Sequence, residues 1–376
     1  MGGTSSSASG VSDDGSVVVG TTGSPNGIRA FRWTPSTGMQ SLGVLASGES
    51  FGGALSSDGA VIVGTSDAPN WRRIAFRWTA VSGMQPVFNN NPYNSAAVDV
   101  SANGDSIVVN LRYFDGSSFV DFAIFTTPGG DYTLNPPVGN ALSAEQCSAD
   151  GTTIVGSMTI YPAPSVTRRA FRWTAQGGIQ NLGALTNAAL ANSQAYCVSA
   201  DGSIIYGSSE QGSGGNRVMF RWTPTEGMTS TGAAMTPADT TADGSIVVGT
   251  DADATRAVRW TQAGGMEDLN TTYAALIRAG WRLTDATAIS SDGRYIVGVG
   301  QNTSGTQAEA FLLDTGCGVH NGDVNLDGCV DDADLLAVLF AFGNSGSNLG
   351  RVDVNCDGAV DDADLLVVLF NFGQGC

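Results

Sequence analysis

The chain contains no lysine and a single histidine, His320, which we expect to be a linker residue. All 17 basic residues are therefore arginine, against 35 acidic residues, and the net charge is −18. So acidic a chain repels phosphate backbones, so we expect no nucleic-acid partner. One imidazole cannot build a multi-histidine zinc site, and no apolar run is long enough for a transmembrane segment. The 42% hydrophobic content and its strong periodicity nevertheless predict a packed core.

The acidic charge is divided unevenly along the 376 residues. Residues 317–376 contain ten Asp, no Glu and one Arg, which gives a net charge of −9. Residues 1–316 contain 25 acidic residues and 16 Arg, again −9. Half of the net charge therefore lies in the last 60 residues, and this contrast predicts two domains, 1–314 and 315–376.

A tetrapeptide of the form Ser/Thr-x-Asp/Asn-Gly, followed by a run rich in Val and Ile, recurs seven times at intervals of 42 to 51 residues. Its copies are Ser12–Gly15, Ser56–Gly59, Ser101–Gly104, Ser148–Gly151, Ser199–Gly202, Thr241–Gly244 and Ser290–Gly293. A segment such as Ala30–Thr34, with the sequence Ala-Phe-Arg-Trp-Thr, follows after a variable loop; the third unit departs from it at Phe122–Thr126. Units of this length with about four short strands each predict a mostly β chain that forms a seven-bladed β-propeller.

Each tetrapeptide has the chemistry of a hairpin turn. Asp-Gly between two β-rich runs predicts a two-residue type I′ turn, in which both central residues have positive φ. Asn103, which replaces Asp in the third unit, tolerates the same conformation. The hydroxyl two residues before the Asp is expected to bond to the turn backbone.

The seventh unit, which ends at Asp314, lacks a fourth strand. Propeller rings usually close with a strand from the other terminus, but Met1–Thr4 is too short and polar to supply one. These residues also lack the features of a signal peptide. We therefore expect that sequence upstream of Met1 is missing.

The seven units resemble HAF repeats of bacterial extracellular proteins, over residues 8–314. The resemblance implies an exported protein and assigns no catalytic residue. Five units share an arginine in the Phe-Arg-Trp segment, at Arg32, Arg77, Arg172, Arg221 and Arg259. These arginines form either a ring of ligand-binding guanidinium groups or one structural contact per blade, for example with the turn Asp of a neighbour. Identical placement favours the structural contact.

Two loops 30 residues apart carry the chemistry of calcium ligands. Oxygen-bearing side chains occupy positions 1, 3, 5, 9 and 12, Gly occupies position 6, and position 7 would contribute a backbone carbonyl. The predicted ligands of two Ca²⁺ ions are Asp323, Asn325, Asp327, Cys329, Asp331 and Asp334 in the first loop, and Asp353, Asn355, Asp357, Ala359, Asp361 and Asp364 in the second. A helix is expected to follow each loop, over 334–343 and 364–373, and none is expected to precede it.

Duplicated loops that each lead into a helix resemble a type I dockerin, over residues 317–376. The resemblance implies a small α-helical domain that folds with calcium and docks onto a cohesin module of a scaffold or surface protein. Cellulosomal dockerins often carry polar or basic side chains at the partner-reading positions, whereas this chain has Leu339, Phe340, Leu369 and Phe370 there. Either the two helices bury these side chains against each other, or they meet an apolar partner.

The cysteines support an extracellular or cell-surface location, because four of the six lie in the small C-terminal domain, where disulfides compensate for a small core. Four cysteines allow three pairings. On near two-fold symmetry we favour Cys317 with Cys376, and Cys329 with Cys356. Cys147 and Cys197 precede the turns of adjacent units, where they either bridge two blades or remain buried thiols.

These features predict a secreted or cell-surface binding protein, in which a propeller platform is carried by a calcium-dependent docking domain. The alternative is a polysaccharide-degrading hydrolase or lyase, because dockerins usually accompany such enzymes. Glycosidase chemistry requires two convergent carboxylates about 5–10 Å apart. No catalytic pair is recognisable, and the candidates are Asp99, Asp115, Asp121, Asp131, Glu145 and Glu309. A third hypothesis is a structural protein without a ligand.

Overall fold

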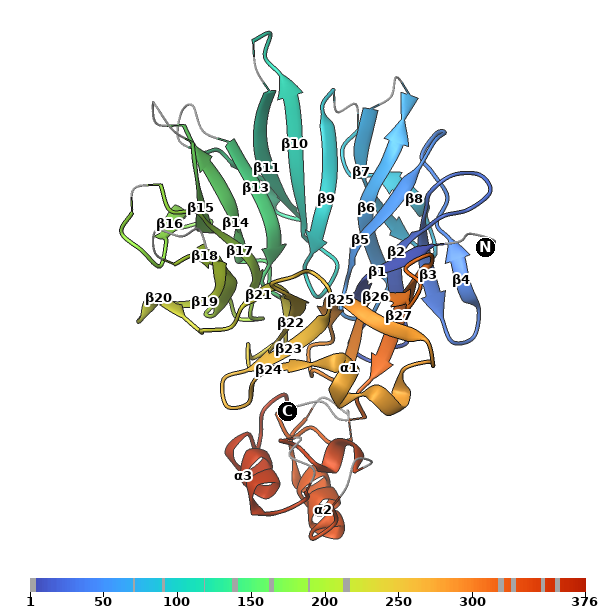
Figure 1. The fold of residues 1–376 in the computed structure, drawn as a ribbon, viewed down its shortest axis with the longest axis vertical. Coiled ribbons are helices and arrows are strands. Elements are labelled where there is room, and N and C mark those ends of the chain that lie inside the picture. The colour runs from blue at the N-terminus through green and yellow to red at the C-terminus, as the bar shows by residue number, and fades with distance from the viewer. Residues whose placement is uncertain are drawn as a thin grey trace.

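The structure is a computed structural model of the whole chain. It describes residues 5–376 apart from 70–71, 90–91, 118, 137–140, 162–165, 189, 212–216, 317–320, 326–328, 346–348 and 356–358. Seven antiparallel sheets follow one another in chain order, and the last of them returns to lie beside the first (Figure 1). A small helical domain lies beyond one end of the sheets (Figure 1). The predicted seven-bladed propeller is confirmed.

Each sheet is one blade, whose strands run outward from the axis in sequence order. The innermost strands are β1 (Ser6–Val11), β5 (Ser50–Leu55), β9 (Asn94–Val100), β13 (Ala141–Cys147), β17 (Ser193–Val198), β21 (Met235–Thr240) and β25 (Trp281–Ile289). The second strands are β2 (Val18–Thr22), β6 (Val61–Ala68), β10 (Ile107–Phe114), β14 (Thr153–Ile160), β18 (Ile205–Glu210), β22 (Ile246–Asp251) and β26 (Tyr295–Asn302).

The third strands carry the Phe-Arg-Trp segments. They are β3 (Arg29–Thr34), β7 (Arg72–Thr79), β11 (Phe119–Thr127), β15 (Thr167–Thr174), β19 (Arg217–Thr223), β23 (Ala257–Thr261) and β27 (Ala308–Asp314). Six blades add an outer strand: β4 (Gly38–Ser41), β8 (Gly83–Pro86), β12 (Gly130–Leu134), β16 (Gly178–Gly183), β20 (Gly227–Ser230) and β24 (Gly265–Asp268). In blade 7, the described residues form three strands, and the segment before β25 contains the one-turn helices α1 (Leu269–Thr272) and η2 (Ala274–Leu276).

The tetrapeptide turns differ from the type I′ turn that the sequence predicts. In blade 1 the N–H of Gly15 donates to the carbonyl of Ser12 (2.9 Å), so Asp13 and Asp14 form the centre and only Gly15 has positive φ, 68°. The Asp14 carboxylate lies inside the turn, where Oδ1 accepts from Ser12 Oγ (2.7 Å) and the N–H of Ser16 (2.9 Å). The type I′ prediction is therefore wrong. The predicted hydroxyl contact is confirmed, because Ser12 Oγ accepts from the N–H of Val17 (2.9 Å).

A glycine on the second strand and a phenylalanine on the third form the core of a typical blade. In blade 4, Gly156 pairs with Phe171, which is fully buried. A Cβ at Gly156 would lie 2.2 Å from the carbonyl oxygen of Ser143 on β13 and 2.9 Å from the Phe171 ring. Glycine is therefore required by the close approach of the inner strand and the aromatic ring.

Blade 3 replaces both members of this pair together. Asn110 occupies the glycine position and Ala123 the phenylalanine position, and the two residues are paired across β10 and β11. The space that the missing ring leaves accommodates the Asn110 amide, which donates to the carbonyl of Ala144 and accepts from its N–H, both at 2.9 Å. The departure of the third unit from the repeat thus creates a side-chain bridge to the next blade.

The ring closes by packing blade 7 against β1. Thr287 Oγ1 donates to the carbonyl of Ala8 (2.9 Å), and the N–H of Ala310 donates to Ser6 Oγ (2.9 Å). Ala8 and Val11 share an apolar cluster with Ala288 and Val297. Residues 1–4, in which the sequence offered no closing strand, lie outside the described residues.

The C-terminal part of the chain, which we call the C-terminal domain, contains α2 (Asp332–Ala341) and α3 (Asp362–Phe370). Both helices follow the predicted loops but begin two residues earlier than expected, and the one-turn helix η3 (Gly350–Val352) precedes the second loop, where none was expected. Among the described residues of this domain, the fully buried hydrophobic side chains are those of Val330, Val338, Val354, Val360 and Val368, so the described core is small. Among the described helices of the whole chain, none combines the length and apolar character needed to cross a membrane.

A disulfide joins Cys329 to Cys376, so the predicted Cys317–Cys376 and Cys329–Cys356 pairing is wrong. The backbone pairing of Val330 accounts for the bond between Cys329 and Cys376. The N–H of Val330 donates to the carbonyl of Gln374, and its carbonyl accepts from the N–H of Gly373. This short ladder places Cys329 beside the last residues of the chain, with a Cα–Cα distance of 4.7 Å. Cys317, Cys356 and His320 lie outside the described residues.

Candidate functional site

The tetrapeptide turns form a continuous ring of hydrogen bonds around the propeller axis. The second residue of each tetrapeptide donates its N–H to the carbonyl of the equivalent residue in the next blade, at 2.8–3.0 Å, along the series Asp13, Ser57, Ala102, Ala149, Ala200, Ala242 and Ser291. The ring is closed by a side chain, since the N–H of Ser291 donates to Asp13 Oδ1 (3.2 Å). These seven residues line one part of a central channel with a cavity of about 310 Å³.

A second set of channel residues comes from β-bulges. Every inner strand has a β-bulge, where the pairing register shifts, at the position five residues before the turn Asp or Asn. A bulge leaves a residue outside the ladder and re-aims its side chain. Here the extra residues all line the channel: Ser9, Gly53 with Ala54, Val98, Glu145, Tyr196, Ala238 and Thr287. They differ from blade to blade, so the channel lacks the seven-fold repetition of the fold.

Three polar side chains that follow a bulge fasten neighbouring blades. Asp99 Oδ2 accepts from the N–H of Cys147 (2.8 Å), and Asp239 Oδ2 accepts from the N–H of Ile289 (3.0 Å). Gln146 makes the equivalent contact with the N–H of Val198 (2.8 Å). The Gln146 amide also donates to Asp239 Oδ1 (2.8 Å), which links blade 4 to blade 6. The non-repeating polar residues therefore hold the inner strands together.

Burial raises the pKa of three carboxyl groups that line the channel, those of Asp99, Glu145 and Asp239. Burial raises the pKa of Asp99 to about 7, although the N–H groups of Cys147 and Val100 oppose the shift, and the charge of Asp239 adds to it. Burial raises the pKa of Glu145 to about 7 as well, against the opposing effects of the Gln194 amide and the charge of Arg168. Burial is also the main cause of the raised pKa of Asp239. Carboxyl groups of this kind can exchange protons near neutral pH.

The acidic residues that the sequence offered as enzyme candidates separate into two groups. Asp99 and Glu145 line the channel. The remaining four lie outside it: Asp115 and Asp131 are exposed, Asp121 pairs with Arg112, and Glu309 pairs with Arg278. Asp239 and Gln146 were missed. Their signal was present, because the positions four and five residues before the turn Asp vary in polarity between otherwise similar units.

Three of the five repeated arginines make a structural contact within their own blade. Arg221 pairs with Glu226, Arg259 pairs with Glu267, and Arg172 donates to Thr153 Oγ1 (3.2 Å), each within its own blade. The predicted structural contact is confirmed for these three arginines, although their partners are not the turn Asp of a neighbouring blade. Cys147 and Cys197 do not bridge blades either: both are buried free thiols, and burial raises the pKa of each well above its usual value.

In each predicted calcium loop, backbone N–H groups of described residues donate to the carboxylate at position 12. Asp334 is fully buried; its Oδ1 accepts from the N–H groups of Val324 (2.6 Å) and Asn325 (3.0 Å), and its Oδ2 from that of Asp331 (3.0 Å). Burial alone would raise the pKa of Asp334, but these N–H donors outweigh it and lower the pKa. Asp364 repeats the arrangement with Asn355 and Asp361.

The ligand positions 9 and 12 also cap the helices. Asp331 and Asp334 form a capping box at α2, and Asp361 and Asp364 form one at α3. Among the described residues, no three acidic, histidine or cysteine side chains converge as a metal site would require. Asp327 and Asp357, at position 5 of each loop, lie outside the described residues. The donor set fits calcium, because its side-chain ligands are carboxylate and amide oxygens.

Large apolar side chains point into solvent on both helices of the C-terminal domain. Phe340 is 87% exposed and Phe370 is 82% exposed. Leu339 and Leu369, which the dockerin resemblance also places at partner-reading positions, are about half exposed, so the two helices do not bury these residues against each other. Four equivalent positions add to the apolar surface: Leu336, Phe342, Leu366 and Phe372.

Comparison with known proteins identifies the fold and no family. No family model matches the sequence, and no curated protein matches it. Among solved structures, an oligogalacturonate lyase in complex with manganese has a TM-score of 0.58 at 13% identity, over 81% of this chain and 88% of that one. The oligogalacturonate lyase of Vibrio parahaemolyticus has a TM-score of 0.56 at 12% identity, over 82% and 88%. A prolyl endopeptidase gives 0.54 at 12% identity, over 82% and 50%. At these identities the likeness extends to the propeller fold alone.

Proposed function

We propose that the protein is a secreted or cell-surface binding protein whose propeller is carried by a calcium-dependent, dockerin-like docking domain. In this proposal the propeller belongs with HAF-repeat proteins, and its ligand class is a polysaccharide. The C-terminal domain binds two Ca²⁺ ions and docks onto a cohesin-like module of a scaffold or surface protein.

The duplicated loop carries this proposal. Two 12-residue loops repeat the same oxygen-bearing positions in the sequence. In each, the buried aspartate at position 12 accepts from backbone N–H groups of the loop and belongs to the capping box of the following helix. Calcium ligands at positions 1, 3, 5, 9 and 12 with glycine at position 6 form such loops. The negative charge of the ten aspartates supports the same interpretation, because bound cations would offset their mutual repulsion.

The exposed apolar residues support a protein partner. Eight large apolar side chains, 46% to 87% exposed, lie at equivalent positions in or just after α2 and α3. Large exposed apolar patches mark interaction sites in soluble proteins. Phe340 and Phe370 would be the central contacts, since aromatic side chains dominate the energetics of many interfaces.

The proposal is tested by calorimetric titration of the full chain with Ca²⁺. The wild type should bind two ions, and the combined Asp323→Ala and Asp353→Ala variant should bind none. Surface plasmon resonance against a panel of cohesins should detect binding that disappears with EGTA and in the Phe340→Ser, Phe370→Ser variant. If the wild type binds no calcium, the docking assignment is wrong.

A polysaccharide hydrolase or lyase is the second candidate. It is supported by the carboxyl groups of the channel. Asp99, Glu145 and Asp239 are non-repeating acidic residues inside an otherwise repetitive fold, and burial raises the pKa of Asp99 and of Glu145 to about 7. Assays of polysaccharide cleavage should then show an activity that Asp99→Asn and Glu145→Gln abolish. Activity that survives both substitutions would place the chemistry elsewhere.

A further inference from the structure

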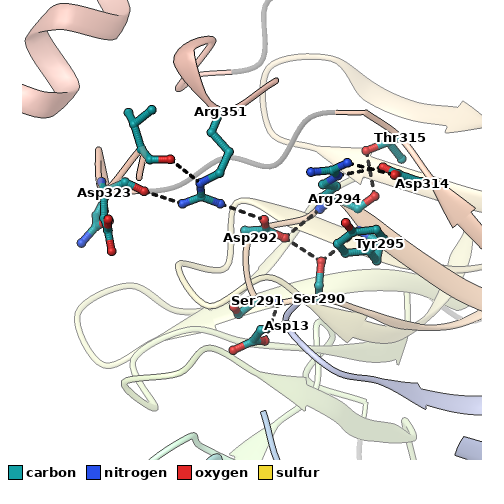
Figure 2. Close-up of polar contacts among 12 residues, drawn as sticks. Asp13, Ser290, Ser291, Asp292, Arg294, Tyr295, Asp314, Thr315, Asp323 and Arg351 are labelled. Carbon is teal, nitrogen blue, oxygen red and sulfur yellow. Dashed lines mark hydrogen bonds and ion pairs between the residues drawn. The ribbon is translucent and has the colours of Figure 1, made fainter. Parts of the chain in front are cut away.

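The C-terminal domain is tied to the propeller by its only arginine. Arg351, in η3, points from the C-terminal domain to the turn of blade 7 (Figure 2). Its Nη1 lies 3.5 Å from Oδ2 of Asp292, the turn aspartate of that blade. The two side chains are only 19% and 16% exposed, so this ion pair is largely withdrawn from water. Charge pairs that are shielded in this way interact more strongly than surface pairs.

The same guanidinium group binds the backbone of the first predicted calcium loop. Arg351 Nη2 donates to the carbonyl of Asp323 (2.6 Å), and Nε donates to the carbonyl of Val324 (3.2 Å). These residues are positions 1 and 2 of the loop. One side chain therefore connects the propeller turn to the segment that carries the first predicted ligand, as Figure 2 shows.

We propose that calcium binding in the first loop and docking of the C-terminal domain on blade 7 are coupled through Arg351 and Asp292. This inference rests on the proposed calcium function. Two effects make docking favour calcium binding. Docking fixes the backbone at 323–324 and so reduces the conformational entropy that calcium binding must remove. Asp292 also neutralises a guanidinium that would otherwise repel a cation beside Asp323.

The coupling is reciprocal, so bound calcium must favour docking by the same factor. The docked position has a consequence for the channel. A cavity of about 790 Å³ separates the C-terminal domain from blades 1, 6 and 7. Asp13, Ala242 and Ser291 line both this cavity and the central channel. Calcium in the first loop would thereby hold the C-terminal domain beside one mouth of the channel.

Blade 3 indicates which substitution tests the ion pair alone. Asn103 occupies the turn position of Asp292 there, and its Oδ1 accepts from Ser101 Oγ (2.8 Å) and the N–H of Asp105 (3.1 Å). The equivalent bonds of Asp292 Oδ1, from Ser290 Oγ and the N–H of Arg294, should therefore survive in Asp292→Asn. The substitution replaces the charged Oδ2 that accepts from Arg351 with a neutral NH2 group and leaves the turn bonds in place. Asp201→Asn, at the turn of blade 5, is the matched control.

The experiment is calorimetric titration of the full chain with CaCl₂ in the wild type, D292N, D201N, R351Q and the D292N/R351Q double variant. We expect D292N to weaken one of two calcium sites about fivefold or more and D201N to leave both unchanged. In the R351Q background, D292N should have no further effect. Hydrogen exchange of wild type should show calcium-dependent protection of the Arg294 and Tyr295 amides that D292N abolishes.

The two hypotheses fail in different ways. Wild-type protein that binds no calcium would refute the proposed function. If calcium binds to wild type and D292N with the same affinity, or if D292N weakens binding equally in the R351Q background, the coupling is refuted while the calcium function stands. Circular dichroism of each variant establishes that it is folded before the affinities are compared.

Discussion

The propeller and the C-terminal domain are stabilised in different ways. Seven apolar clusters include residues of every blade, and a ring of six backbone hydrogen bonds, closed by the Asp13 side chain, joins all seven turns. The C-terminal domain has five fully buried valines, a disulfide and ten aspartates. A core that small offsets little conformational entropy. The comparison predicts that the propeller is stable without metal, whereas the C-terminal domain depends on its disulfide and on bound cations.

We expect the largest effect from substitutions that unfold the C-terminal domain and leave the propeller folded. Asp334→Ala with Asp364→Ala should unfold the C-terminal domain, because each substitution removes a predicted calcium ligand and leaves backbone N–H donors of the loop without their acceptor. Calorimetric melting should lose the transition of this domain and retain that of the propeller. Asp332→Ala with Asp362→Ala, at exposed positions of the same helices, is the control. A normal transition in the first variant would contradict the account.

The propeller should instead be destabilised by substitutions in its apolar core. Phe171→Ala leaves a cavity beside Gly156 and should lower the free energy of unfolding of the propeller by about 3–5 kcal/mol, measured by urea denaturation. The exposed Phe119→Ala should change it little. Calcium binding should be the same in both variants; a loss of calcium affinity in Phe171→Ala would mean that the two regions are not independent in stability.

Removal of the disulfide should affect only the C-terminal domain. Cys329→Ser with Cys376→Ser releases a link between residues 47 positions apart and should cost this domain about 2–5 kcal/mol. The measurement is the melting temperature of each transition in the presence of calcium. A decrease in the propeller transition, or none in that of the C-terminal domain, would be inconsistent with the comparison.

The smallest effect concerns pH and the channel of the propeller. The folded pKa of Asp99 is raised to about 7, so the folded state binds more protons than the unfolded state between about pH 4 and 7. Stability due to this group is therefore full below pH 4 and falls as pH rises to 7. Asp99→Asn keeps an acceptor for the N–H of Cys147 and should raise the free energy of unfolding by on the order of 2 kcal/mol at pH 8, and by far less at pH 5.

The exposed Asp131→Asn, on the outer strand of the same blade, is the control for the pH experiment. Urea denaturation at the two pH values provides the measurement. An equal effect of Asp99→Asn at both would show that its charge is not penalised in the channel.

The repeat predicted the blades because local turn chemistry recurs in the sequence. It did not predict the turn conformation, since the position of Gly15 as the residue after the centre depends on how Ser12 and Asp14 share the turn hydrogen bonds. The channel site was only partly predictable. Asp99 and Glu145 were named as candidates, but the bulges that turn Glu145 and its equivalents toward the axis arise from pairing between strands.

The C-terminal domain shows the same limit. The spacing of its aspartates indicated loops and following helices, and the helices are present. The two-fold symmetry of the duplicated loops could not predict the disulfide partner of Cys329, because this partner depends on the backbone hydrogen bonds between Val330 and the last residues of the chain. Whether Leu339 and Phe340 face a neighbour or solvent likewise depends on how α2 packs against α3.

The dependence of the C-terminal domain on calcium is tested by differential scanning calorimetry of the full chain, first in calcium and then in excess EGTA. In calcium we expect two transitions. EGTA should abolish the transition of the C-terminal domain or shift it far downward, whereas the propeller transition should remain. Identical traces in calcium and EGTA would contradict this dependence.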